Sequence, residues 1–413
     1  MQRFWEKFKD IFLSKGYSWR RVDYPLIAVV LLMGGISAFT LWIIGSGYNT
    51  SANYKKQLIG FALGLFIIAV VALIDYHFIC RFAIIYYILV TGLVAATRFS
   101  PLGSDNDTGA FRWVKIGGFD LQPSELCKIM IIISLAVVFN SMQNRLKTFW
   151  PLLASVVVVA VPLLLILKQP DLSSSLVIVF ILIMMIIASG ESYKILLPLA
   201  AIGIPLLCFA VWYVVQPGNN ILEDYQVGRI LGFIYPDKYP ATMYQQNNSI
   251  DAIASGGLYG KFIVEGTSNI RNYNRVDVTE SDFIWAAFGE EYGFIGCIAV
   301  IIVLILFVML CARITKNASD YLGKMIAVGI SSMFMFQIFV NIGVATRMLP
   351  NTGLPLPFIS SGLSALISYS IAVGILINIK LQPMTKAMGG GFIINNEARN
   401  LAVKNYNDYS RIR

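Results

Sequence analysis

Apolar residues along this chain gather in about ten runs, each long enough to cross a bilayer, since a helical span needs about 20 apolar residues. The runs lie near residues 25–47, 55–75, 78–97, 122–140, 150–168, 172–189, 195–215, 283–312, 321–345 and 361–380. Backbone groups surrounded by lipid must be hydrogen-bonded within their own segment, so runs of this length are helices. The pattern therefore predicts an all-α, polytopic membrane protein with about ten transmembrane helices.

One long polar stretch, residues 216–282, separates the seventh run from the eighth. Loops longer than about 15 residues are usually functional or disordered. Many Ile, Leu, Phe and Tyr residues in this stretch, with an apolar-periodic part around Ile250–Ile253, favour short helices. Its more polar part, 261–279, suits a flexible flap or a sugar-contacting surface. Lys and Arg dominate the short loops on the side shared by both termini, which predicts cytoplasmic termini and an extracytoplasmic long loop.

The chain is accordingly divided into three parts. Residues 1–24 place Phe4, Trp5 and Phe8 at helical spacing between lysines, which indicates an amphipathic segment on the cytoplasmic membrane surface. Residues 25–385 form the ten-helix transmembrane domain. Residues 386–413 are polar and charged and are expected to form a cytoplasmic tail.

Composition narrows the chemistry. Hydrophobic residues make up 57% of the chain and charged residues 13%, and the net charge of +9 is explained by the topology and by attraction to anionic lipid. No basic patch with interleaved aromatics suggests a nucleic acid partner. The five cysteines lack metal-ligand spacing and only one histidine is present, which disfavours zinc sites and Ser-His triads. Acid–base chemistry must therefore come from carboxylates.

Asp282 stands at the edge of the eighth run. A carboxylate at the boundary of lipid and water is costly and is a default site hypothesis. On a helix turning about 100° per residue, Gly289 and Gly293 share its stripe, so a neighbouring helix could approach and turn the carboxylate inward. Alternatively, Asp282 only N-caps the helix. Glu290, deeper in the run, is interpreted as structural support, and at least one of Glu290 and Glu291 needs a polar partner inside the bundle.

A second charged group surrounds the start of the fourth run. Arg112, Trp113 and Lys115 precede it, and Glu125 and Lys128 follow Pro123, which suits the first helical position. The cations could bind a phosphate at the bilayer surface, with Trp113 marking the interface. Alternatively, Glu125 caps the helix and Lys128 neutralises it.

Two loops complete the candidate residues. The turn Lys168–Asp171 is either a surface hairpin or brings Asp171 into a cavity with Glu125 and Lys128. Three prolines between Arg347 and Gly362 forbid a continuous helix, which predicts a re-entrant loop, either architectural or ligand-contacting. Ser360 or Ser361 would cap the last run.

Taken in order, these fragments resemble the SEDS family of shape, elongation, division and sporulation proteins, which includes RodA, FtsW and SpoVE. The resemblance covers residues 20–385 and is carried by Arg112-Trp113, Gln122–Leu126 with Lys128, Gln169–Asp171, Ser255–Lys261, Ser281–Ile284 with Gly289–Glu291, and Leu354–Ser360. It implies a peptidoglycan glycosyltransferase that polymerises lipid II into glycan strands at the outer face of the bacterial plasma membrane. It also implies a class B penicillin-binding protein, a transpeptidase, as partner.

The resemblance places the catalytic aspartate at Asp282. This carboxylate would deprotonate the 4-hydroxyl of lipid II as it attacks the anomeric carbon of the growing chain, with inversion and loss of polyprenyl diphosphate. The cations expected to bind the diphosphate are Arg112, Lys115, Lys128, Arg229 and Arg347, and a divalent cation, Mg²⁺ or Mn²⁺, is a further candidate. Residues expected to support the cavity are Trp113, Glu125, Asp171, Lys261, Glu290 and Ser360.

Two alternatives from other classes stay open. A lipid II flippase or transporter would also carry intramembrane charges and proline-broken helices. A non-catalytic scaffold of the cell-wall synthesis complex would need only its helix faces. The position of Asp282 at the outer end of a helix, instead of at the bilayer midplane, favours the enzyme.

Overall fold

The computed structural model describes residues 17–48, 52–99, 103–104, 112–116, 119–191, 224–266 and 271–382, with scattered positions between 194 and 216. Within this part, seven helices are long and apolar enough to cross a membrane. They are α2 (Tyr24–Tyr48), α3 (Ala52–Leu73), α6 (Pro123–Ser141), α7 (Trp150–Lys168), α13 (Ile284–Asn317), α14 (Tyr321–Ala345) and α15 (Leu363–Leu381). The predicted multi-pass helical membrane fold is confirmed.

Two shorter apolar helices, α5 (Ala83–Phe99) and α8 (Leu172–Ala188), coincide with two more of the predicted runs. The run at 78–97 is split, because α4 (Tyr76–Arg81) ends before Phe82 and α5 begins after it. The run at 195–215 lies largely outside the described residues, so the count of ten helices stays a prediction.

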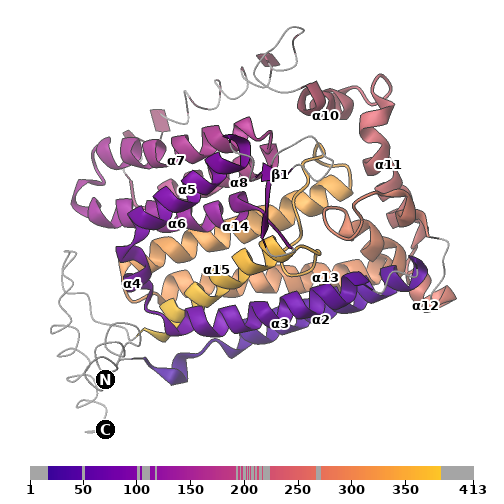
Figure 1. Cartoon of the computed structure of the whole chain (residues 1–413), viewed down its shortest axis with the longest axis horizontal. Helices are drawn as coiled ribbons and strands as arrows, with labels where there is room; N and C mark the ends of the chain where they lie inside the picture. The colour runs from indigo at the N-terminus through magenta and orange to yellow at the C-terminus, as the bar shows by residue number, and fades with distance from the viewer. Residues whose placement is uncertain are drawn as a thin grey trace.

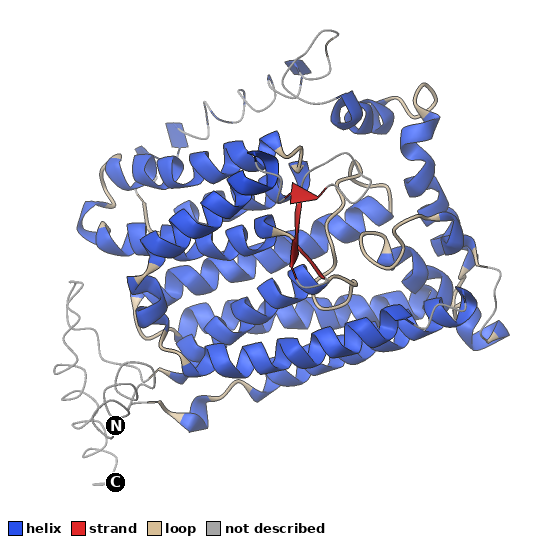
Figure 2. Cartoon of the chain, viewed as in Figure 1, coloured by secondary structure: helices blue, strands red, loops and turns tan. Residues whose placement is uncertain are grey.

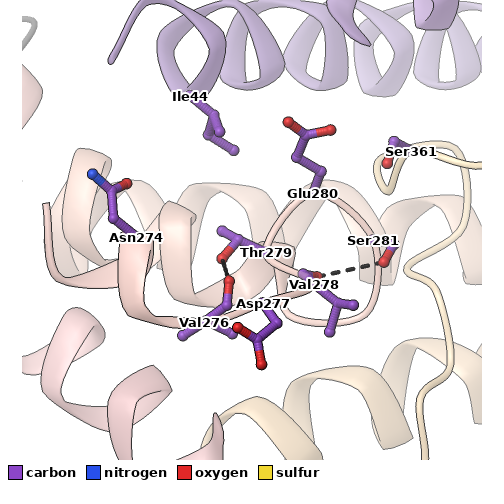
Figure 3. Close-up of a pocket in the computed structure, with 9 residues that line it drawn as sticks. All are labelled: Ile44, Asn274, Val276, Asp277, Val278, Thr279, Glu280, Ser281 and Ser361. Atoms are coloured by element: carbon purple, nitrogen blue, oxygen red, sulfur yellow. Dashed lines mark hydrogen bonds between the residues drawn. The ribbon is translucent and has the colours of Figure 1, made fainter. Parts of the chain in front are cut away.

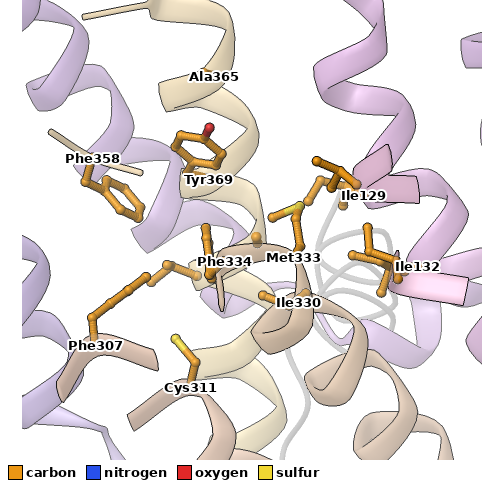
Figure 4. Packing of buried hydrophobic residues seen from close by; sticks show 14 of the residues in the cluster. Ile129, Ile132, Phe307, Cys311, Ile330, Met333, Phe334, Phe358, Ala365 and Tyr369 are labelled. Atoms are coloured by element: carbon orange, nitrogen blue, oxygen red, sulfur yellow. The ribbon is translucent and has the colours of Figure 1, made fainter. Parts of the chain in front are cut away.

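The long helices lie side by side in one bundle (Figure 1). Helices α14 and α15 occupy its middle, with α2, α3 and α13 on one side and α5 to α8 on the other. The buried interior is apolar and rich in aromatic rings (Figure 4): the Phe334 ring lies 4.9 Å from that of Phe307 and 5.7 Å from that of Tyr369. Outward-facing Phe66, Ile84 and Ile302 remain exposed, as expected for surfaces that face lipid.

The first and last described segments meet at one end of the bundle. Between η1 (Trp19–Arg21) and the end of α15, the Ser18 N–H donates to the Leu381 carbonyl at 3.0 Å, and the Arg21 guanidinium donates to the carbonyls of Asn317 and Gln382. This fits an even number of passes. Which side of the membrane this end faces stays a prediction. The predicted cytoplasmic tail and most of the predicted amphipathic segment lie outside the described residues.

The opposite end carries the long loop, which contains α10 (Asp224–Ile234), α11 (Pro240–Ser255), α12 (Lys261–Glu265) and η3 (Asn272–Arg275) (Figure 2). The helix expected around Ile250–Ile253 is therefore confirmed within α11. A short helix, η2 (Gln143–Arg145), joins α6 to α7.

One element was not predicted from the sequence. Between α5 and α6 the chain forms a three-stranded antiparallel sheet of β1 (Gly103–Ser104), β2 (Trp113–Ile116) and β3 (Phe119–Leu121), in that order. Trp113, Val114 and Ile116 are residues favoured in strands, so the signal was present but short. The sheet fixes the outer loop that carries Arg112.

Candidate functional site

Asp282 lies just outside the transmembrane helix α13. The helix begins at Ile284 and its N-cap is Phe283, so the alternative that Asp282 caps this helix is wrong. The Asp282 carbonyl accepts a hydrogen bond of 2.8 Å from Nδ2 of Asn341 on α14, and the same amide donates to the Leu354 carbonyl at 2.6 Å. One side chain thus ties Asp282 to both α14 and the proline-containing segment.

The proline-containing segment, residues 350–362, wraps around Asp282. Gly353 lies so close that a Cβ added there would be 2.9 Å from Oδ2 of Asp282. Ser360 Oγ donates to the Ser281 carbonyl and accepts from the Leu356 N–H at 2.8 Å, and the Ser361 N–H donates to the Glu280 carbonyl. The expectation that Ser360 or Ser361 caps the last helix is wrong, because the N-cap of α15 is Gly362. Both serines instead hydrogen-bond to the loop before α13.

Arg112 and Arg229 line one small cavity, together with Ser173, Gln226, Asn351 and Thr352. Arg112 donates to the carbonyls of Gln169 and Pro170 and so sits on the turn between α7 and α8. Arg229, from α10, lies 3.5 Å from the Asn351 carbonyl. Two cations that are far apart in the sequence therefore meet beside the segment that touches Asp282.

The environment of Asp282 favours the protonated form of its carboxyl more than water does. Burial raises the pKa of its carboxyl, the charges of Arg229 and Arg112 oppose this, and the negative charges of Asp171 and Glu125 add to the rise, so that the pKa is about 6. Among the described residues, no hydrogen bond or ion pair engages its carboxylate oxygens. A carboxylate with such a pKa is well matched to proton abstraction near neutral pH.

Asp171 is a fully engaged structural anion. It N-caps α8 by accepting from the Ser174 N–H at 3.0 Å, and its oxygens also accept from the hydroxyls of Ser124, Ser173 and Ser174. Burial acts to raise the pKa of Asp171, but the charge of Arg112 and the hydrogen bonds from Ser174 and Ser173 lower it overall. Asp171 is therefore ionised and stabilises Arg112 in place.

Glu125 and Lys128 form a buried ion pair of 2.7 Å on α6, whose first residue is Pro123 as expected. The Lys128 side chain is fully buried against Glu125, which fits the interpretation that it neutralises this carboxylate. Lys128 therefore does not line the cavity of Arg112 and Arg229. The other Glu125 oxygen is buried without a hydrogen-bond partner in the described part of the chain.

The long loop is anchored to α13 by two ion pairs. Glu290 pairs with Lys261 and accepts from the backbone N–H groups of Asn272 and Tyr273, while Glu291 accepts from Nε of Arg271 at 2.8 Å. The expectation that at least one of these glutamates has a polar partner is thus confirmed. Anchoring at residue 261 and again at residues 271–273 does not fit a flexible flap, which was one of the two expectations for 261–279.

The glycine stripe of α13 has a different role from the one predicted. A Cβ at Gly289 would lie 2.8 Å from the Ile253 Cα, so the glycine admits α11 of the loop instead of a transmembrane helix. Gly293, with φ 63° and ψ −165°, interrupts the helix, and the freed N–H of Phe294 donates to the Gly257 carbonyl. The regular helical geometry that placed Asp282 on this stripe does not hold.

The remaining predicted residues lie elsewhere. Lys115 is exposed on β2, paired in register with Asp120, and Trp113 is half-buried on the same strand. Arg347, with φ 57°, donates to Asn247 of α11 at 3.2 Å. None of the three lines the cavity of Arg112 and Arg229 or shifts the pKa of Asp282.

The described residues do not test the expected Mg²⁺ or Mn²⁺ ion, which stays a prediction. They contain no group of three or more His, Cys, Asp or Glu side chains placed to share a metal. Asp171 is surrounded by hydroxyl donors and Glu125 is paired with Lys128. One Glu125 oxygen has no hydrogen-bond partner among the described residues, but a single oxygen does not supply the several ligands that such ions take.

Sequence reasoning missed Asn341 and Gly353, which hold the Asp282 backbone and crowd its carboxylate. Asn341 is a polar residue inside an apolar run, a signal that marks functional positions in membrane helices. Gly353 stands between prolines and has φ 71°, a backbone conformation that only the structure reveals.

Comparison with known proteins shows the family of this chain. A family model described as "Cell cycle protein", built on FtsW, RodA and SpoVE, matches residues 23–384. The chain belongs to this family. The resemblance to SEDS proteins is thereby confirmed.

Relatives within the family are similar along nearly their whole length. The probable peptidoglycan glycosyltransferase FtsW of Geobacter metallireducens is 35% identical over 85% of this chain and 93% of its own. The peptidoglycan glycosyltransferase MrdB of Escherichia coli is 30% identical over 89% of this chain and 96% of its own.

Solved structures share the fold. A chain of a peptidoglycan synthase complex, reported for its coordination of polymerization and crosslinking, superposes with a TM-score of 0.73 at 24% identity, covering 88% of this chain and 98% of that chain. RodA of Thermus thermophilus superposes with a TM-score of 0.64 at 20% identity, covering 88% and 97%.

Proposed function

We propose that this SEDS-family chain is a peptidoglycan glycosyltransferase that polymerises lipid II at the outer face of the bacterial plasma membrane. Family membership and the names of its relatives support this activity. The observation that carries it is the position of Asp282, a carboxylate with a raised pKa next to a cavity lined by Arg112 and Arg229.

In the proposed reaction, the 4-hydroxyl of lipid II attacks the anomeric carbon of the growing chain. A bond forms between this oxygen and the anomeric carbon, the bond from that carbon to the polyprenyl diphosphate breaks, and the configuration inverts. Asp282 takes the hydroxyl proton as general base. Arg112 and Arg229 stabilise the negative charge that develops on the leaving diphosphate.

The other charges support these two roles. Asp171 holds Arg112 through its negative charge, and Glu125 adds to the raised pKa of Asp282. Lys115, Lys128 and Arg347 are less suited to bind the diphosphate, because the structure gives them other surroundings. A Mg²⁺ or Mn²⁺ ion, as the sequence suggests, would accompany the diphosphate as part of the substrate.

The remaining assignments are also proposals. Both termini are placed in the cytoplasm, and the end of the bundle that carries Asp282 is placed outside. A class B penicillin-binding protein is proposed as partner, supported by the similar fold of a chain from a peptidoglycan synthase complex.

The enzyme fits the geometry better than the two alternatives. A flippase needs its ionisable site near the bilayer midplane, whereas Asp282 precedes the first residue of α13. A scaffold has no use for a carboxylate held without a hydrogen-bonding partner beside two arginines.

The decisive experiment incubates the purified protein and its cognate transpeptidase with labelled lipid II. Wild type should produce glycan polymer, and Asp282→Ala and Asp282→Asn should produce none. Polymer from Asp282→Ala would refute the assignment of the base. Transbilayer movement of lipid II without polymer from either protein would favour the flippase.

A further inference from the structure

A second cavity, larger than that of the two arginines, is lined by Ser281, the residue before Asp282 (Figure 3). Its volume is about 420 Å³, within the range of about 300–1,000 Å³ that is typical of small-molecule sites. It lies between α2 and the chain that leads into α13. The lining residues are Ile44, Asn274, Val276, Asp277, Val278, Thr279, Glu280, Ser281 and Ser361.

This cavity adjoins Asp282 through the backbone. Ser281 lines it and directly precedes Asp282, and the Ser361 N–H fixes the Glu280 carbonyl at 2.8 Å. The cavity of Arg112 and Arg229 is reached by a different route, through Asn351 and Thr352, which precede the glycine that touches the carboxylate. The loop that holds Asp282 therefore borders one cavity through Ser281, and the segment that contacts its carboxylate borders the other through Asn351 and Thr352.

The two cavities differ in charge. The described lining of the second contains no lysine or arginine, and the Glu280 side chain points across it towards α2, whereas Asp277 points away from α2 (Figure 3). A diphosphate would be repelled by the Glu280 carboxylate. The first cavity carries two guanidinium groups and attracts the same ligand.

The second cavity has the chemistry that recognises a neutral sugar. A carboxylate, an amide and hydroxyls at Glu280, Asn274 and Ser361 can hydrogen-bond to sugar hydroxyls. Ile44 and Val276 supply apolar surface for the C–H face of the ring or for an N-acetyl methyl group. Pockets of this kind combine apolar walls with a few polar groups that fix the orientation of the ligand.

We propose that this cavity is the acceptor subsite, which holds the terminal N-acetylhexosamine of the incoming lipid II with its 4-hydroxyl towards Asp282. The proposal rests on the proposed polymerase function and specifies from which side of the site each of the two substrates binds. The sugar that loses a proton enters from the side of Glu280 and Ser361. The diphosphate of the growing chain lies on the side of Arg112 and Arg229.

The test compares two substitutions that change this cavity without touching the arginines. Glu280→Gln removes the carboxylate, and its control, Asp237→Asn, removes a charge from an exposed turn of the same loop. Ser361→Leu fills the cavity, and its control, Ser361→Ala, does not. Each full-length variant is assayed with its transpeptidase for kcat, for KM of lipid II and for the length of the glycan.

Both cavity variants are expected to raise the KM for lipid II about tenfold or more. Glu280→Gln loses a hydrogen bond to a charged group, which is usually worth about this factor, and Ser361→Leu excludes the sugar by its volume. Glycan length at saturating lipid II should stay that of wild type, because the growing chain binds on the other side. An unchanged KM in Glu280→Gln overturns the proposal. So does shortened glycan at saturating lipid II, since that result would put the growing chain in this cavity.

A binding measurement separates this proposal from the polymerase function. Saturation-transfer NMR with the soluble disaccharide of N-acetylglucosamine and N-acetylmuramic acid should show contact with wild type and with Asp237→Asn. The contact should be lost in Glu280→Gln, and also in Ser361→Leu where that variant folds. Equal contact in wild type and Glu280→Gln overturns the subsite, whether or not polymer is made. Absence of polymer from wild type counts against the polymerase function alone.

Discussion

Gly353 lies directly against the carboxylate of Asp282, so that a Cβ on this glycine would be 2.9 Å from Oδ2. Its φ of 71° is a conformation that side chains rarely adopt, and Asn341 fixes the next residue, Leu354, to the Asp282 backbone. The glycine therefore sets how close the proline-containing segment can come to the proposed base.

Gly353→Ala should reduce polymerisation strongly. The added methyl group displaces the carboxylate, and a misplacement of about 1 Å at a reacting group can cost about a hundredfold in rate. The measurement is the initial rate of glycan formation from labelled lipid II. Gly266→Ala is the matched control, because Gly266 has a similar φ of 69° but open space where its Cβ would lie. Both variants should lose similar stability from backbone strain, and only Gly353→Ala should lose activity.

The rate of polymerisation should rise with pH through about 6, because burial raises the pKa of Asp282 to about 6 and the base must be ionised. Initial rates between pH 5 and pH 8, taken on lipid II in detergent, measure this profile. A rate that does not change with pH across this range would contradict the role of Asp282 as the group that accepts the proton.

The same pKa predicts a stability effect of defined sign. The folded pKa of about 6 exceeds the ordinary 3.8, so the folded state binds the proton more tightly and its stability falls as pH rises from about 4 to 6. Asp282→Asn should therefore unfold at a higher temperature than wild type at pH 7.5. The gain in the free energy of unfolding should be at most about 3 kcal/mol. Near pH 4 the two proteins should have similar stability. Asp237→Asn, in an exposed turn, should show no such pH-dependent gain.

The sequence was sufficient for the membrane helices, because apolar runs of this length have one structural solution in lipid. It also drew attention to Asp282, because a carboxylate at the edge of an apolar run is rare, but it named Arg112 and Arg229 only within a set of five cations. It could not predict how these residues meet. Gly293 breaks α13 and Asn341 reaches the Asp282 carbonyl across the bundle. Both features depend on packing between segments that are distant in the chain, which local periodicity does not record.

Arg271→Ala should destabilise the protein by about 3–5 kcal/mol, because it leaves the Glu291 carboxylate buried and unpaired. Both side chains of this pair are almost fully buried, at 1% exposure each. Thermal unfolding in detergent and hydrogen exchange of residues 271–279 measure the effect. Glu265→Gln is the control, because Arg271 also contacts this glutamate at 3.1 Å but its side chain is 52% exposed. An exposed pair should contribute less than about 1 kcal/mol.

His77 should stabilise the other end of the bundle in a pH-dependent way. Its Nδ1 lies 2.8 Å from Asp75 and its Nε2 lies 2.7 Å from Asp320, so the ring joins the turn before α4 to the turn before α14. Burial acts to lower the pKa of His77, but the hydrogen bonds and charges of Asp320 and Asp75 raise it to about 9. The folded state therefore binds the proton more tightly than the unfolded chain, whose histidine has the ordinary pKa of 6.5.

The contribution of His77 is thus complete below pH 6.5 and is lost as pH rises through about 9. His77→Gln should unfold at a lower temperature than wild type at pH 6, and the difference should shrink steadily up to about pH 9.5. The effect should be modest, because the His77 side chain is 40% exposed and water screens its charge. Thermal unfolding across this pH range in detergent measures it. A difference that stays constant with pH would mean that the ring acts by packing against Tyr76 and not by its charge.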